Sequence, residues 1–156
     1  MKNLYFYKMP IGIIGIAEKN NSITNIYFGD YHIEDAIIKE TPILDKAALE
    51  LKEYFGGKRR AFDLSFEVLG TEFMQKVWYS LCDIPYAETR SYKDIAISVG
   101  NPNASRAVGR ANNCNPIAII IPCHRVIGSN NTLMGYGGGI EIKQYLLDLE
   151  KAYKNK

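Results

Sequence analysis

The sequence has no long apolar run, few cysteines and few histidines. No stretch approaches the ~20 apolar residues of a membrane-spanning helix, so we expect no membrane association. The N-terminal segment MKNLYFYKMP lacks an apolar core followed by a small-residue cleavage site, so it does not resemble a secretory signal. Three cysteines without such a signal are typical of free thiols in a reducing compartment, and we expect a cytoplasmic protein.

The same scarcity argues against a metal site. The two histidines, His32 and His124, are far apart in the sequence, and there is no CxxC pair. Structural zinc usually takes four clustered Cys or His ligands. A zinc deaminase needs a second cysteine three residues after the first in its P-C-x-x-C motif, and after Cys123 that position is Val126. We therefore expect no metal and no cofactor.

The charges of the whole chain nearly cancel, since 19 basic residues stand against 17 acidic ones. The balance is uneven along the chain. Residues 90–125 contain only one acid, Asp94, and five basic residues: Arg90, Lys93, Arg106, Arg110 and Arg125. This local positive charge predicts where a polyanion would bind. A hydrophobic content of 47% is enough for a packed core and excludes disorder of the whole chain.

Residues 1–70 are predicted to form a small domain of antiparallel sheet and one helix. Segments rich in Ile and Tyr are predicted strands: Leu4–Lys8, Gly12–Ala17 and Ser22–Phe28. Asn20-Asn21 suits a hairpin turn between the last two, because Asn tolerates positive φ. Thr41-Pro42 predicts a helix start with a capping hydroxyl, and Gly56-Gly57 predicts its end. A further strand is predicted where apolar residues alternate with polar ones: Phe62, Leu64 and Phe66.

Residues 71–156 are predicted to form a second, mainly helical domain, which makes the fold class α+β. Thr71 is the expected cap of a first helix, and Ser91 with Asp94 forms a capping box at the start of another. A break at 100–102 and a helix over about 103–113 complete a helix-turn-helix pattern. The apolar run Ile117–Ile121 predicts a short buried strand that leads into Pro122-Cys123-His124-Arg125.

The second helix of this pair has two faces of opposite character. At ~100° per residue, Val108 and the alanines around it lie on one side, while Arg106, Arg110 and Asn113 lie on the other with Gly109 beside them. Two arginines on a solvated face would give the same pattern without any ligand. The helix-turn-helix frame and the local positive charge favour a nucleic acid instead.

Cys123 is the candidate nucleophile. A nearby positive charge, such as that of Arg125, lowers the pKa of a thiol and favours the reactive thiolate. Neighbouring side chains on a strand point to opposite faces, so a turn or a bridging water must bring His124 to Cys123. Glu150 lies at the edge of the inner face of a predicted helix over about 140–153, where it can orient the imidazole. The alternative for Cys123 is a buried, inert thiol.

The inner face of the helix predicted over about 140–153 is expected to carry four apolar or aromatic residues: Ile142, Tyr145, Leu146 and Leu149.

The segment from Asn115-Pro116 to Ile121-Pro122-Cys123-His124-Arg125-Val126-Ile127 resembles the signature of the O6-alkylguanine-DNA alkyltransferases, the methylated-DNA–protein-cysteine methyltransferases. The resemblance covers about residues 71–156, and residues 1–70 match only loosely, as a variable N-terminal domain. It extends to several further motifs: Ile84-Pro85-Tyr86, Ser91-Tyr92, Arg106-Ala107-Val108-Gly109, Gly135-Tyr136 and Glu150. Ala87 stands where family members often have Gly, and Gly137 where some have Ser.

The resemblance implies DNA repair in a single turnover. Cys123 would take the alkyl group from guanine O6 in one displacement and keep it as a thioether. His124 would maintain the thiolate through a water, Glu150 would hold His124, and Asn115 would brace the active-site turn. Tyr92 would assist base extrusion and protonate the departing guanine. Activity on O4-methylthymine remains open.

The resemblance also implies a monomer that binds double-stranded DNA containing O6-alkylguanine through the minor groove and flips the base. Arg106 would enter the duplex and fill the vacated space, and Asn112 and Asn113 would lie on the groove side. Further DNA contacts would come from the following residues: Ser91, Tyr92, Ala107, Gly109, Arg110 and Arg125. The flipped base would be held by a pocket that consists of Cys123, Val126, Tyr136 and Gly137.

Two other interpretations have different consequences. A non-catalytic alkyltransferase-like protein would bind alkylated DNA without reacting, but such proteins replace the acceptor cysteine, which is present here as Cys123. A Cys–His acyl-transfer hydrolase would react without DNA, and the basic helix-turn-helix would then have no role.

Overall fold

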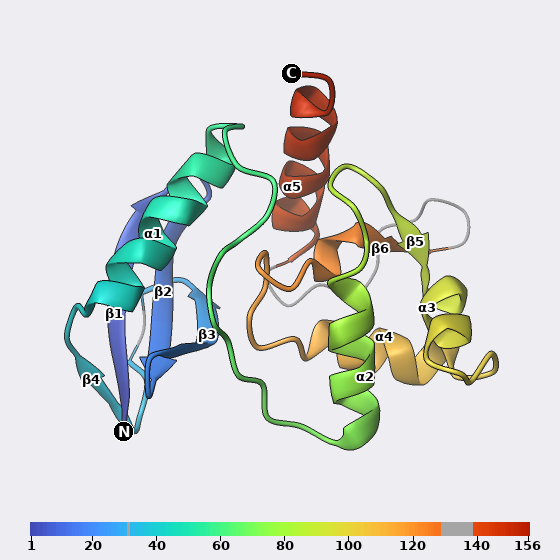
Figure 1. Ribbon diagram of the computed structural model, residues 1–156, viewed down its shortest axis with the longest axis horizontal. Coiled ribbons are helices and arrows are strands. Elements are labelled where there is room, and N and C mark those ends of the chain that lie inside the picture. Colours follow the sequence, from blue (N-terminus) through green and yellow to red (C-terminus); the bar gives the residue numbers. More distant parts are fainter. Residues whose placement is uncertain (31, 129–138) are drawn as a thin grey trace. The chain divides into compact units, whose positions relative to one another are not determined.

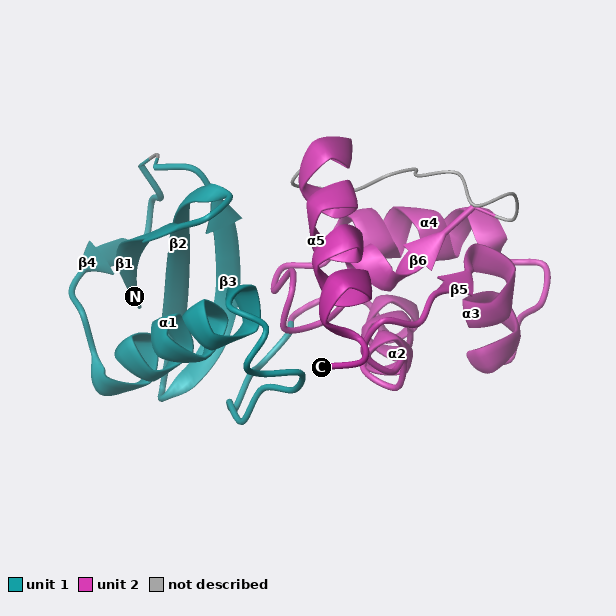
Figure 2. Cartoon of the chain, turned by 90° about the horizontal axis from the view of Figure 1, so that it is seen from above, with its two compact units in different colours: residues 1–68 teal, residues 69–156 magenta. Residues whose placement is uncertain are grey.

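The computed structural model describes residues 1–30, 32–128 and 139–156. The chain divides into two compact units, residues 1–68 and 69–156 (Figures 1 and 2). Within the described ranges, no helix combines the length and the apolar character needed to cross a bilayer.

The first unit contains a four-stranded sheet with the order β3-β2-β1-β4. Strands β1 (Lys2–Met9), β2 (Gly12–Lys19) and β3 (Ser22–Phe28) are antiparallel neighbours, as predicted. Asn20 and Asn21 have φ values of 53° and 65°, which a tight hairpin turn requires of both its central residues. Strand β4 (Ala36–Ile38) was not predicted, because it has only three residues and pairs parallel to the distant β1.

Helix α1 (Pro42–Phe55) packs its apolar stripe on this sheet, with Leu44, Ala47 and Leu51 fully buried (Figure 1). Proline occupies the first turn as predicted, but the expected hydroxyl cap is wrong, since the Thr41 side chain makes no capping hydrogen bond. The chain leaves the helix through Gly57, whose φ is 74°.

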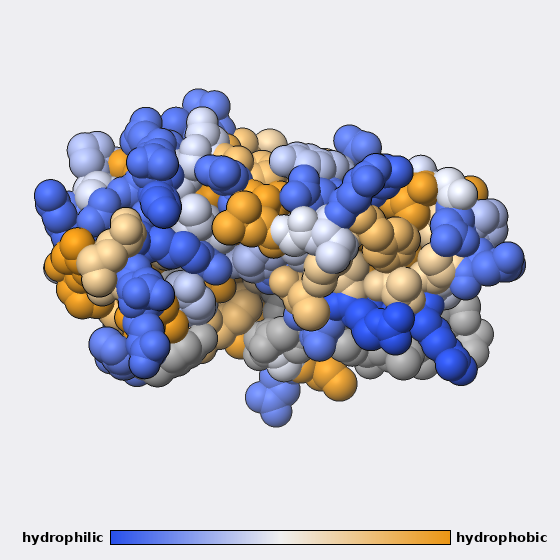
Figure 3. Space-filling view, turned by 90° about the horizontal axis from the view of Figure 1, so that it is seen from below, coloured by the Kyte–Doolittle hydropathy of each residue, from blue (hydrophilic) through white to orange (hydrophobic). Residues whose placement is uncertain are grey.

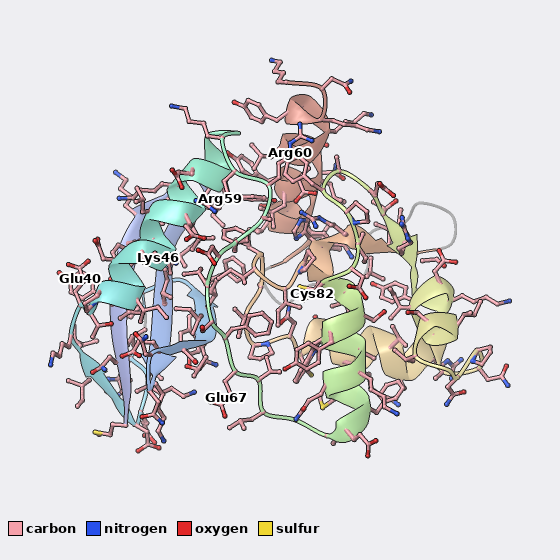
Figure 4. All side chains as sticks on the ribbon, viewed as in Figure 1. Glu40, Lys46, Arg59, Arg60, Glu67 and Cys82 are labelled. Carbon is pink, nitrogen blue, oxygen red and sulfur yellow. The ribbon has the colours of Figure 1, made fainter. Side chains whose placement is uncertain are left out.

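The strand predicted around Phe66 does not form. The segment makes one isolated parallel bridge, in which the Ile23 N–H donates to Ser65 (2.8 Å) and the Glu67 N–H donates to Ile23 (2.9 Å). Charged groups fix it to α1 instead: buried Glu50 accepts from the Asp63 N–H at 2.8 Å and pairs at 3.4 Å with Arg59. Arg59 lies in the segment that follows α1 (Figure 4). The alternation of apolar and polar residues therefore reflects partial burial of one side of this segment and does not indicate a paired strand.

The second unit is mainly helical, as predicted. Its elements in chain order are α2 (Glu72–Leu81), β5 (Arg90–Ser91), α3 (Tyr92–Ser98), α4 (Ser105–Asn113), the 3-10 turn η1 (Cys123–Arg125), β6 (Val126–Ile127) and α5 (Ile140–Tyr153). The Thr71 hydroxyl caps α2 by accepting from Met74 at 3.1 Å, and the capping box of Ser91 and Asp94 starts α3. Gly100, with φ of 86°, separates α3 from α4 in the helix-turn-helix.

The core of this unit forms around Trp78 of α2, which is 2% exposed. Its indole N–H donates to the Ala111 carbonyl at 2.8 Å and thereby fixes α2 against α4. A Cβ on Gly70 would lie 2.7 Å from the indole ring, so only glycine fits where the chain passes this side chain. This packing holds α4 beside the turn that carries Cys123.

Candidate active site

Asn115 shapes the segment that leads to Cys123. Its side-chain amide donates to the Ile121 carbonyl at 2.7 Å, and its oxygen accepts from the Ile117 N–H at 3.0 Å. The segment is therefore a closed turn, in which the Ile121 N–H donates to Ile117 at 2.9 Å and Ile119 has a φ of 74°. The predicted strand Ile117–Ile121 is wrong, although its burial is correct, because the Asn115 amide holds the backbone in a turn. The placement of Asn115 agrees with a bracing role.

Cys123 is the first residue of η1 and is 2% exposed. Its carbonyl accepts a hydrogen bond from the Asn112 side chain at 3.2 Å. Asn112 was expected on the groove side of α4, but it is buried at 1% exposure. It stands four residues after Val108, and the helical spacing alone would have placed it on the apolar back of the helix. Asn112 thus helps to position Cys123.

His124, Arg125 and Glu150 form one buried cluster. His124 Nε2 lies 2.6 Å from Glu150 Oε2, as the predicted relay requires. Arg125 Nε donates to Glu150 Oε1 at 2.9 Å and Nη2 donates to Oε2 at 3.0 Å, so the guanidinium binds both carboxylate oxygens. The backbone N–H of Ala87 donates to Oε1 at 3.0 Å, and Arg125 Nη1 donates to the Ile84 carbonyl at 2.7 Å.

The burial of Arg125 corrects one prediction. Arg125 was expected to contact DNA, but it is 7% exposed, and each guanidinium nitrogen donates inside the protein. A guanidinium paired with a buried carboxylate is not available to a phosphate.

The environment sets the protonation of this cluster. Burial by itself would raise the pKa of Glu150, but the hydrogen bonds from His124 and Arg125 and the positive charge of Arg125 outweigh it and hold that pKa well below its usual range. Burial lowers the pKa of His124; Glu150 opposes this effect, and the charges of Arg125 and Lys143 reinforce it. A carboxylate beside a neutral imidazole is therefore the favoured resting state.

Lys143 belongs to the site although the sequence analysis did not identify it. It is fully buried in α5, and its Nζ lies 5.9 Å from the centre of the Tyr92 ring. Burial lowers the pKa of Lys143 to about 8, against the opposing effect of Cys123. Lys143, Leu146 and Glu150 follow one another at i, i+3 and i+7, so helical spacing could have identified this face.

The inner face predicted for α5 is thus only partly correct. Leu146 is fully buried, but Tyr145 is 40% exposed.

Tyr92 is half-buried at the start of α3. Burial and the charge of Cys123 raise the pKa of its phenol. A Cβ on Gly109 would lie 3.9 Å from the Tyr92 ring, which places this ring beside α4. Ser91 precedes it, with its hydroxyl engaged in the capping box.

The basic face of α4 is exposed as predicted. Arg106, Arg110 and Asn113 are exposed, and Val108 and Ala111 on the opposite side are buried. In the view from below, Figure 3 shows hydrophilic side chains interspersed with apolar ones on the surface of the second unit. Between the arginines stand the half-exposed Ala107 and Gly109, whose small size permits close approach to another surface.

The predicted pocket is only partly covered by the structure. Val126 is buried in β6, which pairs with β5 at Arg90. Tyr136 and Gly137 lie outside the described residues. Within the described part of the chain, no three His, Cys, Asp or Glu side chains come together in a way that could hold a metal ion.

A buried cysteine followed in the chain by a histidine that contacts a buried glutamate, on a unit with an exposed basic helix-turn-helix, is the arrangement expected of a cysteine protein that acts on nucleic acid. The sequence matches two domain families, described as "6-O-methylguanine DNA methyltransferase, DNA binding domain" over residues 72–152 and "6-O-methylguanine DNA methyltransferase, ribonuclease-like domain" over residues 4–68. The chain therefore belongs to the 6-O-methylguanine DNA methyltransferase family, as its motifs predicted.

Similar proteins agree with this assignment over more than nine-tenths of the chain. A methylated-DNA–protein-cysteine methyltransferase of Methanosarcina barkeri is 50% identical over 146 residues, which cover 91% of this chain and 92% of the relative. The constitutive enzyme of Bacillus subtilis is 46% identical over 156 residues, with 94% of each chain covered. A crystal structure of Mycobacterium tuberculosis OGT in complex with DNA superposes with a TM-score of 0.91 at 43% identity and covers 97% of this chain and 94% of that one.

Proposed function

We propose that this protein repairs DNA by transferring the alkyl group of O6-alkylguanine to Cys123, irreversibly and once per molecule. The observation that carries the proposal is the contact, at 2.6 Å, between Glu150 and His124, the residue that follows Cys123 in the chain. An inert buried thiol has no need of an ionised carboxylate next to its neighbouring histidine. The acceptor cysteine is intact, and relatives that match most of the chain are named methyltransferases, so transfer is favoured over binding alone.

The reaction is a single displacement. The Cys123 Sγ–H bond breaks and its proton passes to the His124 imidazole, through a water in the family scheme. The thiolate attacks the alkyl carbon, the carbon–O6 bond breaks with its electron pair going to guanine, and Tyr92 supplies a proton to the departing base. Because its pKa is raised, Tyr92 stays protonated until the departing guanine accepts the proton. The Lys143 ammonium stabilises the thiolate by its charge.

The DNA substrate is a duplex, and the basic face of α4 is its binding surface. Arg106 and Arg110 are exposed there and bind phosphate or enter the groove, while Ala107 and Gly109 allow close approach. The base must leave the stack, at a cost of roughly a few kcal/mol, because its reacting carbon is inaccessible in paired DNA. Arg106 offsets part of this cost by filling the gap. The protein acts as a monomer, in the cytoplasm, where thiols remain reduced.

The test is methyl transfer from a duplex that contains O6-methylguanine, followed by peptide mass spectrometry. The methyl group is expected on the peptide of Cys123 and in no more than one copy per protein. Cys82 and Cys114 are free thiols in the same chain and serve as internal controls. Methyl on either of these, or no transfer at all, would refute the proposal. Cys123→Ala should abolish transfer and retain DNA binding, whereas lesion-specific binding by the parent without transfer would favour the non-catalytic alternative.

A further inference from the structure

Arg125 lies in the chain of contacts behind Cys123 and has no place in the reaction proposed above. We propose that Arg125 is a positioning residue that fixes Glu150 as an oriented carboxylate and thereby keeps His124 a neutral imidazole with its accepting nitrogen directed away from Glu150. The inference rests on the proposed function, because a neutral His124 matters only if it accepts the thiol proton of Cys123. The geometry and the test below do not require methyl transfer.

The hydrogen bonds to Glu150 determine the tautomer of His124. Oε1 accepts from Arg125 Nε and from the Ala87 N–H, and Oε2 accepts from Arg125 Nη2. The contact between Oε2 and His124 Nε2, at 2.6 Å, joins a carboxylate that only accepts to a ring nitrogen that must therefore donate. In the neutral ring the lone pair then resides on Nδ1, which becomes the nitrogen that takes the thiol proton.

The charge of Arg125 decides whether the ring is neutral. Among the described residues, the charged groups that act on His124 are Glu150 and Lys143 from α5 and Arg125 from η1. With Arg125 bound to both oxygens, the negative charge of Glu150 is already balanced. Without Arg125, the buried carboxylate would have His124 as its nearest counter-charge and would favour an imidazolium. An imidazolium has no lone pair with which to accept the thiol proton.

The loop before β5 holds this arrangement in place. The Ile84 carbonyl accepts from Arg125, and the Ala87 N–H donates to Glu150, so two backbone groups of one loop fix both partners of the ion pair. The Tyr86 ring lies under the guanidinium, 5.6 Å from its centre to Arg125 Cζ. Lysine cannot reproduce this fork, because its ammonium is a single point of charge.

The experiment compares Arg125→Met with Arg125→Lys. Nitrogen-15 NMR of the histidine rings reports the tautomer and the charge directly, and with only two histidines in the chain, His32→Gln leaves the signals of His124 alone. In the parent, His124 is expected to be neutral at pH 7 with hydrogen on Nε2. In Arg125→Met its pKa should rise until the ring is an imidazolium at pH 7, because the buried carboxylate has then lost its other counter-charge. Arg125→Lys keeps the charge, so His124 should remain neutral.

The rate at which iodoacetamide alkylates Cys123 gives a second readout that requires no DNA. In the parent, the thiol proton moves to His124 within the site, so the rate should be flat between about pH 6.5 and 8. In Arg125→Met, His124 already holds a proton, and the rate should rise by about tenfold per pH unit below the new pKa. The Cys114 peptide of the same sample is the internal control.

Thermal unfolding shows whether each variant folds. If Arg125→Met does not fold, Arg125→Gln retains a donor for Glu150 without the charge and replaces it. A folded, uncharged variant with a neutral His124 and a flat alkylation profile would overturn the proposal. So would a tenfold loss of affinity for undamaged duplex with unchanged His124, which would return Arg125 to a DNA contact. Failure of methyl transfer in the parent would leave these measurements unaffected and would refute only the proposed function.

Discussion

Replacing Glu150 by glutamine is expected to destabilise the protein and to change the tautomer of His124. Among the described residues, four hydrogen bonds to the carboxylate are seen, two on each oxygen. Glutamine offers one acceptor oxygen and one NH2 group, so two of the four donors would face N–H groups. The least costly arrangement puts the NH2 group at the Oε2 position, where His124 can accept at Nε2 only by moving its proton to Nδ1. The nitrogen that takes the thiol proton is then lost.

The magnitude follows from the burial of the pair. Removing one member of a buried ion pair costs about 3–5 kcal/mol, because the other charge stays buried without a partner. For a chain of this size, 1 kcal/mol corresponds to roughly 2–4 °C, so Tm should fall by about 6–20 °C at pH 7. Methyl transfer should slow by about 100-fold or more, which is the usual contribution of a general base.

The pH dependence has a definite sign. Because folding lowers the pKa of Glu150, its stabilisation is complete above the ordinary glutamate value of ~4.3 and is lost as the pH falls through the lower folded-state pKa. The parent should therefore lose more stability on acidification than Glu150→Gln does. Calorimetric unfolding from pH 7 downward measures this difference.

The matched control is Glu88→Gln. Glu88 pairs with Arg90 at 3.1 Å, but the two side chains are 48% and 38% exposed, so the change should cost less than about 1 kcal/mol. The reasoning fails if Glu150→Gln melts within about 2 °C of the parent and transfers methyl at a comparable rate.

Three further predictions concern other parts of the site. Arg106→Ala should slow transfer from duplex DNA by about tenfold, which corresponds to ~1.4 kcal/mol, because the gap left by the flipped base is no longer filled. Reaction with the free base should hardly change, and equal effects on both substrates would exclude an insertion role. Because folding lowers the pKa of Lys143, the parent should gain stability as the pH rises from about 8 to 10.5; Lys143→Met should be more stable than the parent at pH 7 and should lack this gain. Calorimetry across that range tests this, and an equal gain in both proteins would contradict it. Ala87→Gly should raise stability by about 0.5–1 kcal/mol, since alanine has a φ of 65° there, and a lower Tm would contradict the strain argument.

Several features could be predicted from the sequence because their causes are local. The Asn20-Asn21 turn, the Thr71 cap and the capping box of Ser91 with Asp94 all satisfy backbone groups within three residues along the chain. The opposite faces of α4 depend only on helical period, so the exposure of Arg106 was also correct. The motif around Cys123 was sufficient to identify the family.

The tertiary structure alone decided which charged and polar residues are buried. Arg125 is basic and follows the active-site histidine, and nothing near it in the sequence shows that its partner is Glu150, 25 residues later. An apolar run such as Ile117–Ile121 indicates burial, but the side-chain amide of Asn115 determines that its backbone turns. Sequence patterns indicate whether a residue tends to be buried or exposed and which local hydrogen bonds it can form with its neighbours in the chain. Contacts between distant segments decide where a charge is stable without water, and here those contacts form the active site.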